Sequence, residues 1–413
     1  MRKLKLVMVG NGMAGVRTLE ELLKIAPDLY DITVFGAEPH PNYNRILLSP
    51  VLAGEHTVDE IILNPLSWYA DNGITLHLGK TVTEIDRQRR RVVAEDGTTA
   101  DYDRLLIATG STPFVPPVPG RELAGVIAYR DIADTNEMID AATKYRHAVV
   151  IGGGLLGLEA ANGLMLRGMQ VTVVHLSGTL MERQLDGIAG DLLRKSLVER
   201  GLQFALAAQT QSLLSGDDGR VRAVQLKDAQ GRLFEVPADL VVMAAGVRPN
   251  TMLAEKAGLH CSRGIVVTDT MQTVTDPRVY SVGECAAHRG IAYGLVAPLF
   301  EQGKVCATHL AQFGIGRYLG SQVSTKLKVT GIDLFSAGNF AGGAGTEEIV
   351  LSDPVTGVYK KLVIQNDQLV GACLYGDTLD GNWYFKLVRE RRDISGIRDR
   401  LMFGEAYANE VAA

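Results

Sequence analysis

The chain has 413 residues, which is enough for two or three domains with sizeable cores. Its net charge is −5, so the composition gives no reason to expect binding to nucleic acid or to a membrane surface. The 45 glycines exceed the usual share, as in folds that bring the backbone close to a ligand.

The cysteines and histidines form no metal-binding pattern. No C-x-x-C pair occurs among Cys261, Cys285, Cys306 and Cys373, so neither a zinc site nor an iron–sulfur cluster is expected within these residues. A disulfide framework is not expected either, which favours a reducing, cytoplasmic location. The eight histidines lack ligand spacing, and we expect no metal site. No signal peptide or lipid-spanning segment is expected.

The first element in chain order is an apolar strand over 4–9, which runs into Gly10-Asn11-Gly12-Met13-Ala14-Gly15. A predicted helix over 16–25 and a strand over 31–35 follow. The spacing is G-x-G-x-x-G between a strand and a helix. The first glycine permits the turn, the second lets a pyrophosphate approach the main chain, and the third lets the helix pack on the strand.

The next segment is punctuated by glycine and proline. Short strands are predicted between 74 and 93, and a buried strand over 105–109 ends at Gly110. The proline-rich stretch 113–120 fits neither a helix nor a central strand, so a crossing between domains is predicted there.

A second glycine fingerprint, Gly152-Gly153-Gly154-Leu155-Leu156-Gly157, follows a strand that begins at His147. A helix over 155–167, a strand over 171–175, a helix over 188–200 and a strand over 240–244 are predicted after it. The last strand leads into Gly246 and a second crossing that ends at 250. One fingerprint is a weak signal, but two in one chain favour two nucleotide-binding domains.

The sequence pattern changes after about residue 321. Strands of an antiparallel sheet are predicted over 326–329, 359–364 and 369–375, followed by a helix over 382–391. The predicted fold is α/β, with two Rossmann-like three-layer domains and a C-terminal α+β domain. The predicted boundaries are 1–113 with 250–320 for a discontinuous FAD-binding domain, 114–249 for an NAD(P)-binding domain and 321–413 for an interface domain.

Each fingerprint helix offers free N–H groups and a partial positive charge to phosphates. In such units an acidic residue about 20 positions further on normally binds a ribose. The first unit has none at the strand end, but Glu38 follows two residues after Gly36. Glu38 is therefore expected to reach the ribose, and the alternative is a solvated loop carboxylate.

His175 stands where the second unit would carry its acidic residue. A carboxylate there would favour NADH and repel the 2′-phosphate of NADPH. His175, with Ser177 and Arg183 nearby, leaves both cofactors open. The alternative is an exposed histidine with no role in specificity.

Glu159 lies two residues beyond Gly157 on the second fingerprint helix. Its neighbours are apolar, so burying its carboxylate without a partner would be costly. A role on the cofactor side is favoured, and the alternative is an ordinary helix residue.

These features together resemble the FAD/NAD(P)-dependent pyridine nucleotide-disulfide oxidoreductases. The chain is most similar to the N-terminal flavin region of the large subunit of assimilatory NAD(P)H nitrite reductases, and rubredoxin and ferredoxin reductases are close relatives. The segment 43–49 resembles the family's Y-x-R-x-x-L-S motif, and 108–110 resembles its A-T-G strand end. The segment 280–285 resembles the second flavin motif, with Glu284 in place of the commoner aspartate.

The resemblance implies a set of site residues. For FAD these are Gly10, Gly12, Met13, Ala14, Gly15, Glu38, Arg45, Ser49, Val82, Ala108, Thr109, Gly110, Gly283, Glu284 and Val296, the last at the start of a helix that points at the flavin ring. For NAD(P)H they are Gly152, Gly154, Leu155, Leu156, Gly157, His175 and Gly246, with Glu159 as the catalytic residue.

The sequence departs from its relatives in two ways. Pro50 stands where many ferredoxin reductases have a lysine. The nitrite reductase large subunits also continue into a cysteine-rich 2Fe-2S domain and a sirohaem-binding part, which these residues do not include. The chain is therefore expected to be either a fragment or a stand-alone electron-delivering subunit.

The predicted activity is hydride transfer from NAD(P)H to FAD, followed by electron transfer to an iron–sulfur/sirohaem partner or domain for nitrite reduction. No cysteine precedes Cys261, which argues against a disulfide reductase. The first alternative is a rubredoxin or ferredoxin reductase. An alternative of another class is a flavoprotein that senses NAD(P)H by binding it. Oligomeric state is left open.

Overall fold

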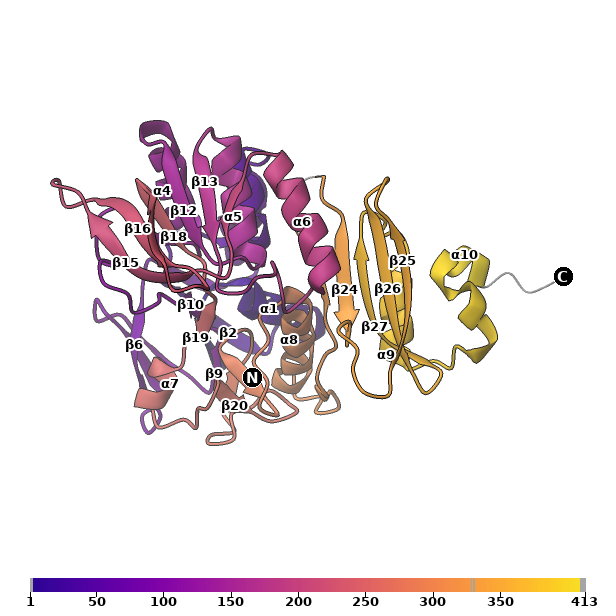
Figure 1. The fold of residues 1–413 in the computed structure, drawn as a ribbon. Coiled ribbons are helices and arrows are strands. Elements are labelled where there is room, and N and C mark those ends of the chain that lie inside the picture. Colours follow the sequence, from indigo (N-terminus) through magenta and orange to yellow (C-terminus); the bar gives the residue numbers. More distant parts are fainter. Residues whose placement is uncertain (1–2, 328, 330, 409–413) are drawn as a thin grey trace. The chain divides into compact units, whose positions relative to one another are not determined.

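The computed structural model describes residues 3–327, 329 and 331–408, and the chain divides into two compact units. Unit 1 comprises Met1–Leu47, Thr57–Thr112 and Val247–Ser321, and unit 2 comprises Leu48–His56, Pro113–Gly246 and Gln322–Ala413. Both are α/β, in agreement with the expected fold class (Figure 1).

Unit 1 is built on a parallel five-stranded sheet whose order is β21-β9-β1-β2-β5. Strand β1 pairs with β2 so that Val9 lies opposite Phe35, and with β9 so that Val9 lies opposite Ile107. The sheet comprises β1 (Leu4–Val9), β2 (Tyr30–Gly36), β5 (Thr75–Leu78), β9 (Arg104–Ile107) and β21 (Val279–Ser281).

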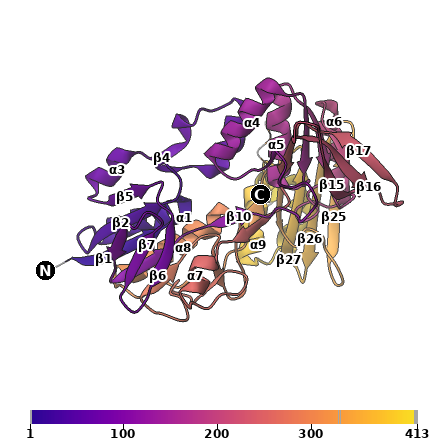
Figure 2. The same ribbon diagram turned by 90° about the vertical axis from the view of Figure 1, so that its left-hand side faces the viewer.

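Two long helices of unit 1, α1 (Met13–Ile25) and α8 (Val296–Leu310), pack against each other. Their buried apolar faces share a core with the sheet, which includes Leu19, Leu106 and Cys306. A second layer, visible in Figure 2 beside β1, is the antiparallel sheet of β6 (Val82–Asp86), β7 (Arg91–Ala94) and β8 (Thr99–Asp101).

The remaining elements of unit 1 are short. The helices are α3 (Leu66–Asp71) and α7 (Met252–Lys256), and the 3₁₀ turns are η1 (Arg45–Leu47) and η2 (Asp59–Ile61). The two-stranded ladders pair β3 (Asn42–Tyr43) with β4 (Ile62–Asn64), β20 (Ile265–Val267) with β22 (Ala286–His288), and β10 (Ser111–Pro113), whose first two residues belong to this unit, with β19 (Val247–Pro249).

Unit 2 repeats the same plan with the strand order β11-β18-β12-β13-β14. Here Ile151 of β12 lies opposite Val174 of β13 and Met243 of β18. The sheet comprises β11 (Val126–Ala128), β12 (His147–Ile151), β13 (Gln170–Val174), β14 (Gln203–Ala205) and β18 (Leu240–Met243). Its helices are α2 (Leu48–Ala53), α4 (Ile132–Lys144), α5 (Leu155–Leu166) and α6 (Gly187–Glu199), and an antiparallel sheet is formed by β15 (Gln209–Ser215), β16 (Val221–Lys227) and β17 (Leu233–Pro237).

The C-terminal part of unit 2 is an antiparallel sheet with the order β23-β24-β27-β26-β25. It comprises β23 (Ser324–Thr325), β24 (Leu334–Gly338), β25 (Glu347–Asp353), β26 (Val358–Gln365) and β27 (Gln368–Tyr375), and it is followed by α9 (Gly381–Glu390), η3 (Ser395–Phe403) and α10 (Glu405–Ala408). The predicted strands over 359–364 and 369–375 and the helix over 382–391 lie within one residue of these bounds.

The strand predicted over 326–329 is wrong in position. The strand here is β23, which ends at Thr325, and Lys326 and Leu327 lie outside any strand. Residue 328 is outside the described residues. Ser324 and Thr325 lie opposite Ala337 and Ser336 of β24, and among the described residues the ladder ends before Lys326.

The predicted domain boundaries can be set beside these units. The predicted boundaries after 113 and after 249 lie within a few residues of the unit limits, which fall before Pro113 and after Gly246. The unit division places 322–413 together with 113–246 and adds the short segment Leu48–His56 to them. Separate evolutionary domains within unit 2 stay a prediction.

Helix α6 is joined to the C-terminal sheet through its N-cap, Asp186. The Asp186 side chain accepts a hydrogen bond from the Ala189 N–H at 3.0 Å and caps the helix. It also accepts a bond from the buried Tyr359 hydroxyl at 2.6 Å, and it lies 3.9 Å from the ammonium of Lys361. One carboxylate therefore serves both a helix end and a buried sheet face.

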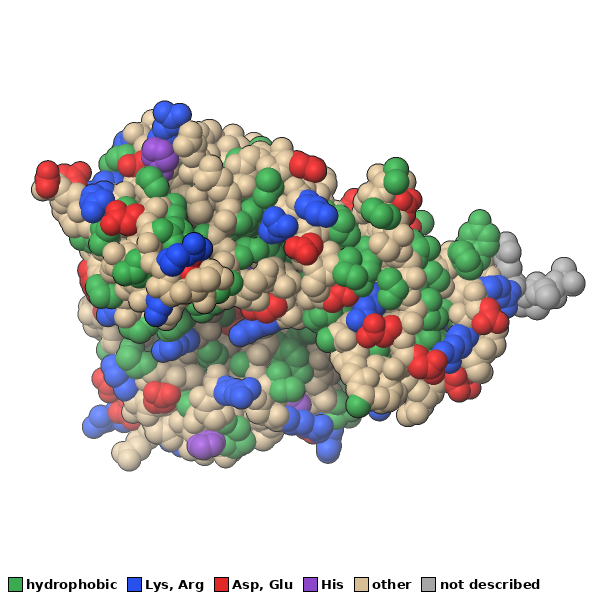
Figure 3. Space-filling model, viewed as in Figure 1, with side chains coloured by type: hydrophobic (Ala, Val, Ile, Leu, Met, Phe, Trp, Pro, Cys, Tyr) green, Lys and Arg blue, Asp and Glu red, His purple; other side chains and the backbone are tan. Residues whose placement is uncertain are grey.

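On the face drawn in Figure 3, basic and acidic side chains are interspersed, in keeping with the small net charge. Within the described part of the chain, every helix is too short or too polar to cross a membrane.

The side chain of Asp134 makes the stability of unit 2 depend on pH. It is the N3 residue of a capping box at the start of α4, where its carboxylate accepts a bond from the Arg130 N–H at 2.6 Å. Burial, and next the neighbouring Asp131, raise the pKa of Asp134 to about 6 despite that bond. The folded state therefore holds this proton more tightly than the unfolded state.

We expect Asp134→Asn to be more stable than the wild type at pH 8. The contribution of a group with a raised pKa is fully present below its ordinary value of 3.8 and is lost as the pH rises through about 6. The difference between the two proteins should therefore shrink as the pH falls from 8 to 5. Urea unfolding in a Trp68→Phe background follows unit 2 through Trp383 alone, since the chain has two tryptophans. A difference that does not change with pH would contradict this assignment.

Candidate functional site

The first glycine fingerprint forms an open cradle at the start of α1. Gly12 is the N-cap residue, and no side chain caps the helix. A Cβ added to Gly12 would meet nothing within 4 Å. Next to it, the buried Nδ2 of Asn11 has no hydrogen-bond partner. Free N–H groups, space and an unpartnered donor at one helix N-terminus fit a dinucleotide phosphate.

The two flanking glycines serve packing. Gly10 has φ +105°, and a Cβ there would lie 2.2 Å from the carbonyl oxygen of Ala108. A Cβ on Gly15 would lie 2.9 Å from the Ala108 Cβ. The fingerprint and the predicted A-T-G strand end are thus brought into contact, with Met13 and Ala14 in the first turn of α1.

Glu38 is held by two side chains of unit 1. It accepts bonds from the Tyr43 hydroxyl at 2.7 Å and from Arg45 Nη2 at 2.5 Å. The Glu38 side chain is 32% exposed. The predicted residues Glu38 and Arg45 therefore lie side by side, and the carboxylate is oriented rather than freely solvated.

Hydrogen bonds within unit 1 hold both the predicted A-T-G segment and the second flavin motif. Thr109 Oγ1 donates to the Asn250 carbonyl at 3.2 Å, and Asn250 Nδ2 donates back to the Thr109 carbonyl at 2.8 Å. Ser111 Oγ donates to Glu284 Oε2 at 2.7 Å. The Gly283 N–H donates to Oε1 of Gln302, a fully buried side chain of α8.

Two further predicted flavin residues have different settings. Val296 is the first residue of α8, whose N-cap Leu295 supplies no side-chain bond. Val82 begins β6 and its side chain is buried in the core with Phe35 and Ala94. A role for Val82 beside a cofactor would therefore fall to its backbone.

The second fingerprint repeats the cradle in unit 2. Gly154 is the uncapped N-cap of α5, and a Cβ on it would meet nothing within 4 Å. A Cβ on Gly152 would lie 2.2 Å from the Ala244 carbonyl oxygen, and one on Gly157 would lie 1.9 Å from the Gly152 carbonyl oxygen. As in unit 1, the outer glycines allow close packing and the middle glycine faces open space.

Two other long helices of unit 2 begin differently, with a carboxylate cap. Helix α4 is capped by Asp131, and α6 is capped by Asp186. Both fingerprint helices lack such a carboxylate, which would repel a phosphate. The half-buried Leu155 and Leu156 form the first turn of α5, and Gly246 has φ +110° with open space beside it.

His175 directly follows β13 and lies against the fingerprint loop. Its Nδ1 accepts a bond from the Gly153 N–H at 3.1 Å, and its Nε2 lies 2.9 Å from Glu182 Oε2. Its side chain is 13% exposed. The alternative of an exposed histidine is therefore wrong about its exposure, because the ring packs on Gly153.

Glu159 has the partner that its apolar surroundings require. Ser49 Oγ, from α2, donates to Glu159 Oε2 at 2.8 Å, and the Tyr129 hydroxyl donates to Ser49 Oγ at 3.3 Å. All three residues belong to unit 2. Burial first, and the nearby Glu159 charge, raise the pKa of Tyr129, so its hydroxyl stays a donor.

Several residues in these clusters carry no sequence signal of their own. They are Ser111, Tyr129, Glu182, Asn250 and Gln302. Each contacts a predicted residue from a distant or loop position. Asn250 alone stood in a segment singled out by the sequence, the second crossing.

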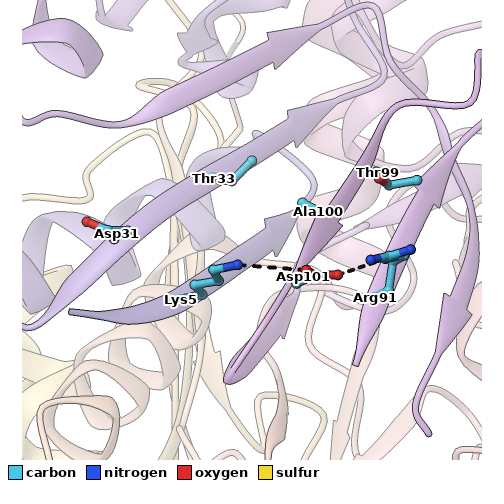
Figure 4. A pocket seen from close by; sticks show the side chains of 7 residues that line it. All are labelled: Lys5, Asp31, Thr33, Arg91, Thr99, Ala100 and Asp101. Atoms are coloured by element: carbon cyan, nitrogen blue, oxygen red, sulfur yellow. Dashed lines mark hydrogen bonds and ion pairs between the residues drawn. The ribbon is translucent and has the colours of Figure 1, made fainter. Parts of the chain in front are cut away.

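Unit 1 also contains a small polar hollow. It has a volume of about 330 Å³ and is lined by Lys5, Asp31, Thr33, Arg91, Thr99, Ala100 and Asp101 (Figure 4). Asp101 pairs with Arg91 at 2.7 Å and with Lys5 at 3.7 Å. Both basic side chains of the hollow are therefore paired with Asp101, and the hollow contains no fingerprint residue.

The cysteines of the described chain are all free thiols, and Cys285 is buried with its Sγ 3.4 Å from the Val282 carbonyl oxygen. Among residues 3–327, 329 and 331–408, no three His, Cys, Asp or Glu side chains are grouped to hold a metal ion.

Known proteins share both the sequence and the fold. The chain is 50% identical over 395 residues to nitrite reductase [NAD(P)H] of Bacillus subtilis (strain 168), covering 96% of this chain and 48% of that protein. It is 46% identical to the assimilatory nitrate reductase electron transfer subunit of the same organism, covering 96% and 50%. The chain thus spans about half the length of these relatives.

Among solved structures, the covalent putidaredoxin reductase–putidaredoxin complex matches with a TM-score of 0.85 and 27% identity, covering 95% of this chain and 94% of that chain. Residues 324–392 match the rubredoxin NAD+ reductase C-terminal domain. Residues 4–312 match the pyridine nucleotide-disulphide oxidoreductase model. The chain belongs to the pyridine nucleotide-disulphide oxidoreductase family, whose members bind FAD and NAD(P)H.

Proposed function

We propose that this chain is the flavin-bearing, NAD(P)H-oxidising part of a nitrite-reducing system. The observation that carries the proposal is the pair of uncapped helix starts at Gly12 and Gly154, each with open space over the middle glycine. The cradle in unit 1, supported by Glu38 and Glu284, is proposed to hold FAD. The cradle in unit 2 is proposed to hold the nicotinamide cofactor.

When bound, the flavin supplies hydride acceptance from the nicotinamide and release of electrons one at a time. The residues of the chain bind and orient. The free N–H groups of α1 and α5 would hold the two pyrophosphates. Glu38, fixed by Tyr43 and Arg45, would accept hydroxyl bonds from the flavin-side ribose.

The acceptor proposed first is an iron–sulfur or sirohaem domain or subunit. Two relatives of about twice the matched length are nitrite reductase [NAD(P)H] and an assimilatory nitrate reductase electron transfer subunit, which supports this choice. The four cysteines are free thiols and mostly buried, and none forms a C-x-x-C dithiol that could take the electrons. A cytoplasmic location stays a prediction.

The test is stopped-flow reduction of the purified yellow protein by NADH and by NADPH, followed at the flavin band. Pre-reduced protein is then mixed with a 2Fe-2S protein or with a dye of matched potential. Faster transfer to the 2Fe-2S protein than to the dye is the expected result. Equal rates would count against the proposed acceptor, and absence of a flavin spectrum would overturn the whole proposal.

A rubredoxin or ferredoxin reductase is the second candidate. The match of residues 324–392 to the rubredoxin NAD+ reductase C-terminal domain favours it specifically. Adding rubredoxin to the same experiment separates the two, because the second candidate requires rubredoxin to be the faster acceptor. Steady-state dye reduction would count against a protein that only senses NAD(P)H.

Glu159 is proposed to act on the nicotinamide side of the site. We expect Glu159→Ala to slow reduction of the flavin about tenfold to a hundredfold, since a misplaced cofactor loses its reactive geometry. Ser49→Ala removes the 2.8 Å bond that orients the carboxylate, and it should have a smaller effect in the same direction.

Flavin content and thermal stability serve as controls for both variants. Tyr129→Phe is the matched control, because it removes the 3.3 Å bond to Ser49 and leaves the Ser49–Glu159 bond in place. Wild-type reduction rates in Glu159→Ala would leave Glu159 as an ordinary helix residue.

A further inference from the structure

A carboxylate lies beside the end of β13, but it does not belong to the residue at the strand end. In βαβ nucleotide-binding units the adenosine ribose lies at the end of this second strand, where an acidic residue accepts its hydroxyl bonds. Here the strand-end residue is His175, and the carboxylate beside it belongs to Glu182, seven positions later.

The hydrogen bonds fix the form of the His175 ring. The Gly153 N–H donates to Nδ1, so this nitrogen carries no proton. Nε2 therefore carries the proton and donates it to Glu182 Oε2 at 2.9 Å. Both ring nitrogens are used within the protein, which leaves His175 no donor for a phosphate.

The loop that carries Glu182 is anchored to the same fingerprint peptide. The Met181 N–H donates to the Gly153 carbonyl at 3.0 Å, and the Met181 side chain is 1% exposed. A Cβ on Gly153 would lie 2.8 Å from His175 Cγ, so a glycine is needed for this packing. Glu182 is thus held at a defined position next to the cradle.

The carboxylate is also available and charged. The Glu182 side chain is 44% exposed. Burial raises its pKa, but the hydrogen bond from His175 and next the Glu182 N–H, with a smaller contribution from the charge of Arg183, lower the pKa below its ordinary value. An ionised carboxylate accepts hydroxyl hydrogen bonds and repels a phosphate.

We propose that Glu182 is the carboxylate that binds the adenosine ribose of the nicotinamide cofactor, and that it selects NADH over NADPH. His175 is a positioning residue, since it acts by holding Glu182. This inference rests on the proposed binding of NAD(P)H at the Gly152 fingerprint. It narrows the cofactor, which the sequence left open, to the form with a free 2′-hydroxyl.

The exposed Arg183 is the competing residue for a 2′-phosphate. Arg183 directly follows Glu182 in the sequence. If Arg183 decided the choice of cofactor, the protein would favour NADPH over NADH. The test therefore includes both residues.

The experiment measures binding to the flavin-loaded protein by isothermal titration, with ADP-ribose and 2′-phospho-ADP-ribose as probes. Neither probe has a nicotinamide, so the readout is independent of turnover. The wild type should bind ADP-ribose at least about tenfold more tightly, as expected for a charged hydrogen bond. Glu182→Gln should reduce this ratio about tenfold, and His175→Ala should reduce it in the same direction.

Glu199→Gln is the matched control, because Glu199 is an exposed carboxylate at the opposite end of α6, and it should keep the wild-type ratio. An unchanged ratio in Glu182→Gln, or a wild-type preference for the 2′-phosphate that disappears in Arg183→Ala, would overturn the inference while leaving the proposed function intact. Failure of the wild type to bind either probe would overturn both.

Discussion

Replacing Gly12 by valine should yield a folded protein that purifies with about a tenth or less of the wild-type flavin. Gly12 has φ −85° and ψ 176°, an extended conformation that valine adopts without strain. A Cβ there meets no protein atom within 4 Å, so the added methyl groups fall in the space assigned to the pyrophosphate. The cost to the helix start is only about 1 kcal/mol or less.

The reciprocal variant, Gly154→Val, is the control. Gly154 has the same role in α5, with φ −86° and ψ −175°. This protein should keep its flavin and lose its response to NAD(P)H. Absorbance of the purified proteins gives the flavin content, and circular dichroism verifies folding. Flavin loss in Gly154→Val together with retention in Gly12→Val would reverse the assignment of the two cradles.

Asp186→Ala should lower the free energy of unfolding of unit 2 by about 3 kcal/mol, because it removes a helix cap and the acceptor of a buried hydroxyl at once. It also takes one carboxylate away from Lys361, a 7% exposed residue that stays paired with Glu348 at 2.9 Å. Burial, followed by Asp186, raises the pKa of Tyr359, so the hydroxyl remains protonated and would lose its acceptor.

Urea unfolding in the Trp68→Phe background measures the effect, since the reporter Trp383 is 6% exposed in the C-terminal part of unit 2. Tyr359→Phe removes one bond and keeps the cap, so its loss should be about 1 kcal/mol. Equal losses for Tyr359→Phe and Asp186→Ala would mean that the cap and Lys361 contribute nothing.

The parts of the fold that follow from local chemistry were predictable. Glycine spacing after an apolar run identified both cradles, because a tight turn and a close helix approach demand particular positions such as Gly10 and Gly157. The antiparallel strands β26 and β27 also followed from their patterns. Strand ends were less predictable. Ala108 and Thr109 read as strand, yet β9 ends at Ile107.

The partners of the site residues could not be predicted, because tertiary packing brings them together. Ser49 meets Glu159 across 110 positions of sequence, and Ser111 meets Glu284 across 173. Glu182 is close in sequence to His175, but its role depends on a loop that folds back onto Gly153. Neither residue type nor spacing indicates that a loop folds back in this way.

The strand order of unit 1 has a consequence for synthesis on the ribosome. Strand β9 lies between β1 and β21, and β21 begins only at Val279. The last strand of the unit 2 sheet ends at Met243. In unit 1, by contrast, the Tyr30 hydroxyl donates at 2.8 Å to the carbonyl of Leu310, which is synthesised much later. A chain released at about 245 residues contains every strand of the second sheet, while the first still exposes the edge of β9 and the α8-facing side of α1. The first nucleotide cradle to be translated is the last to be finished, so chains interrupted before α8 should be the ones that aggregate.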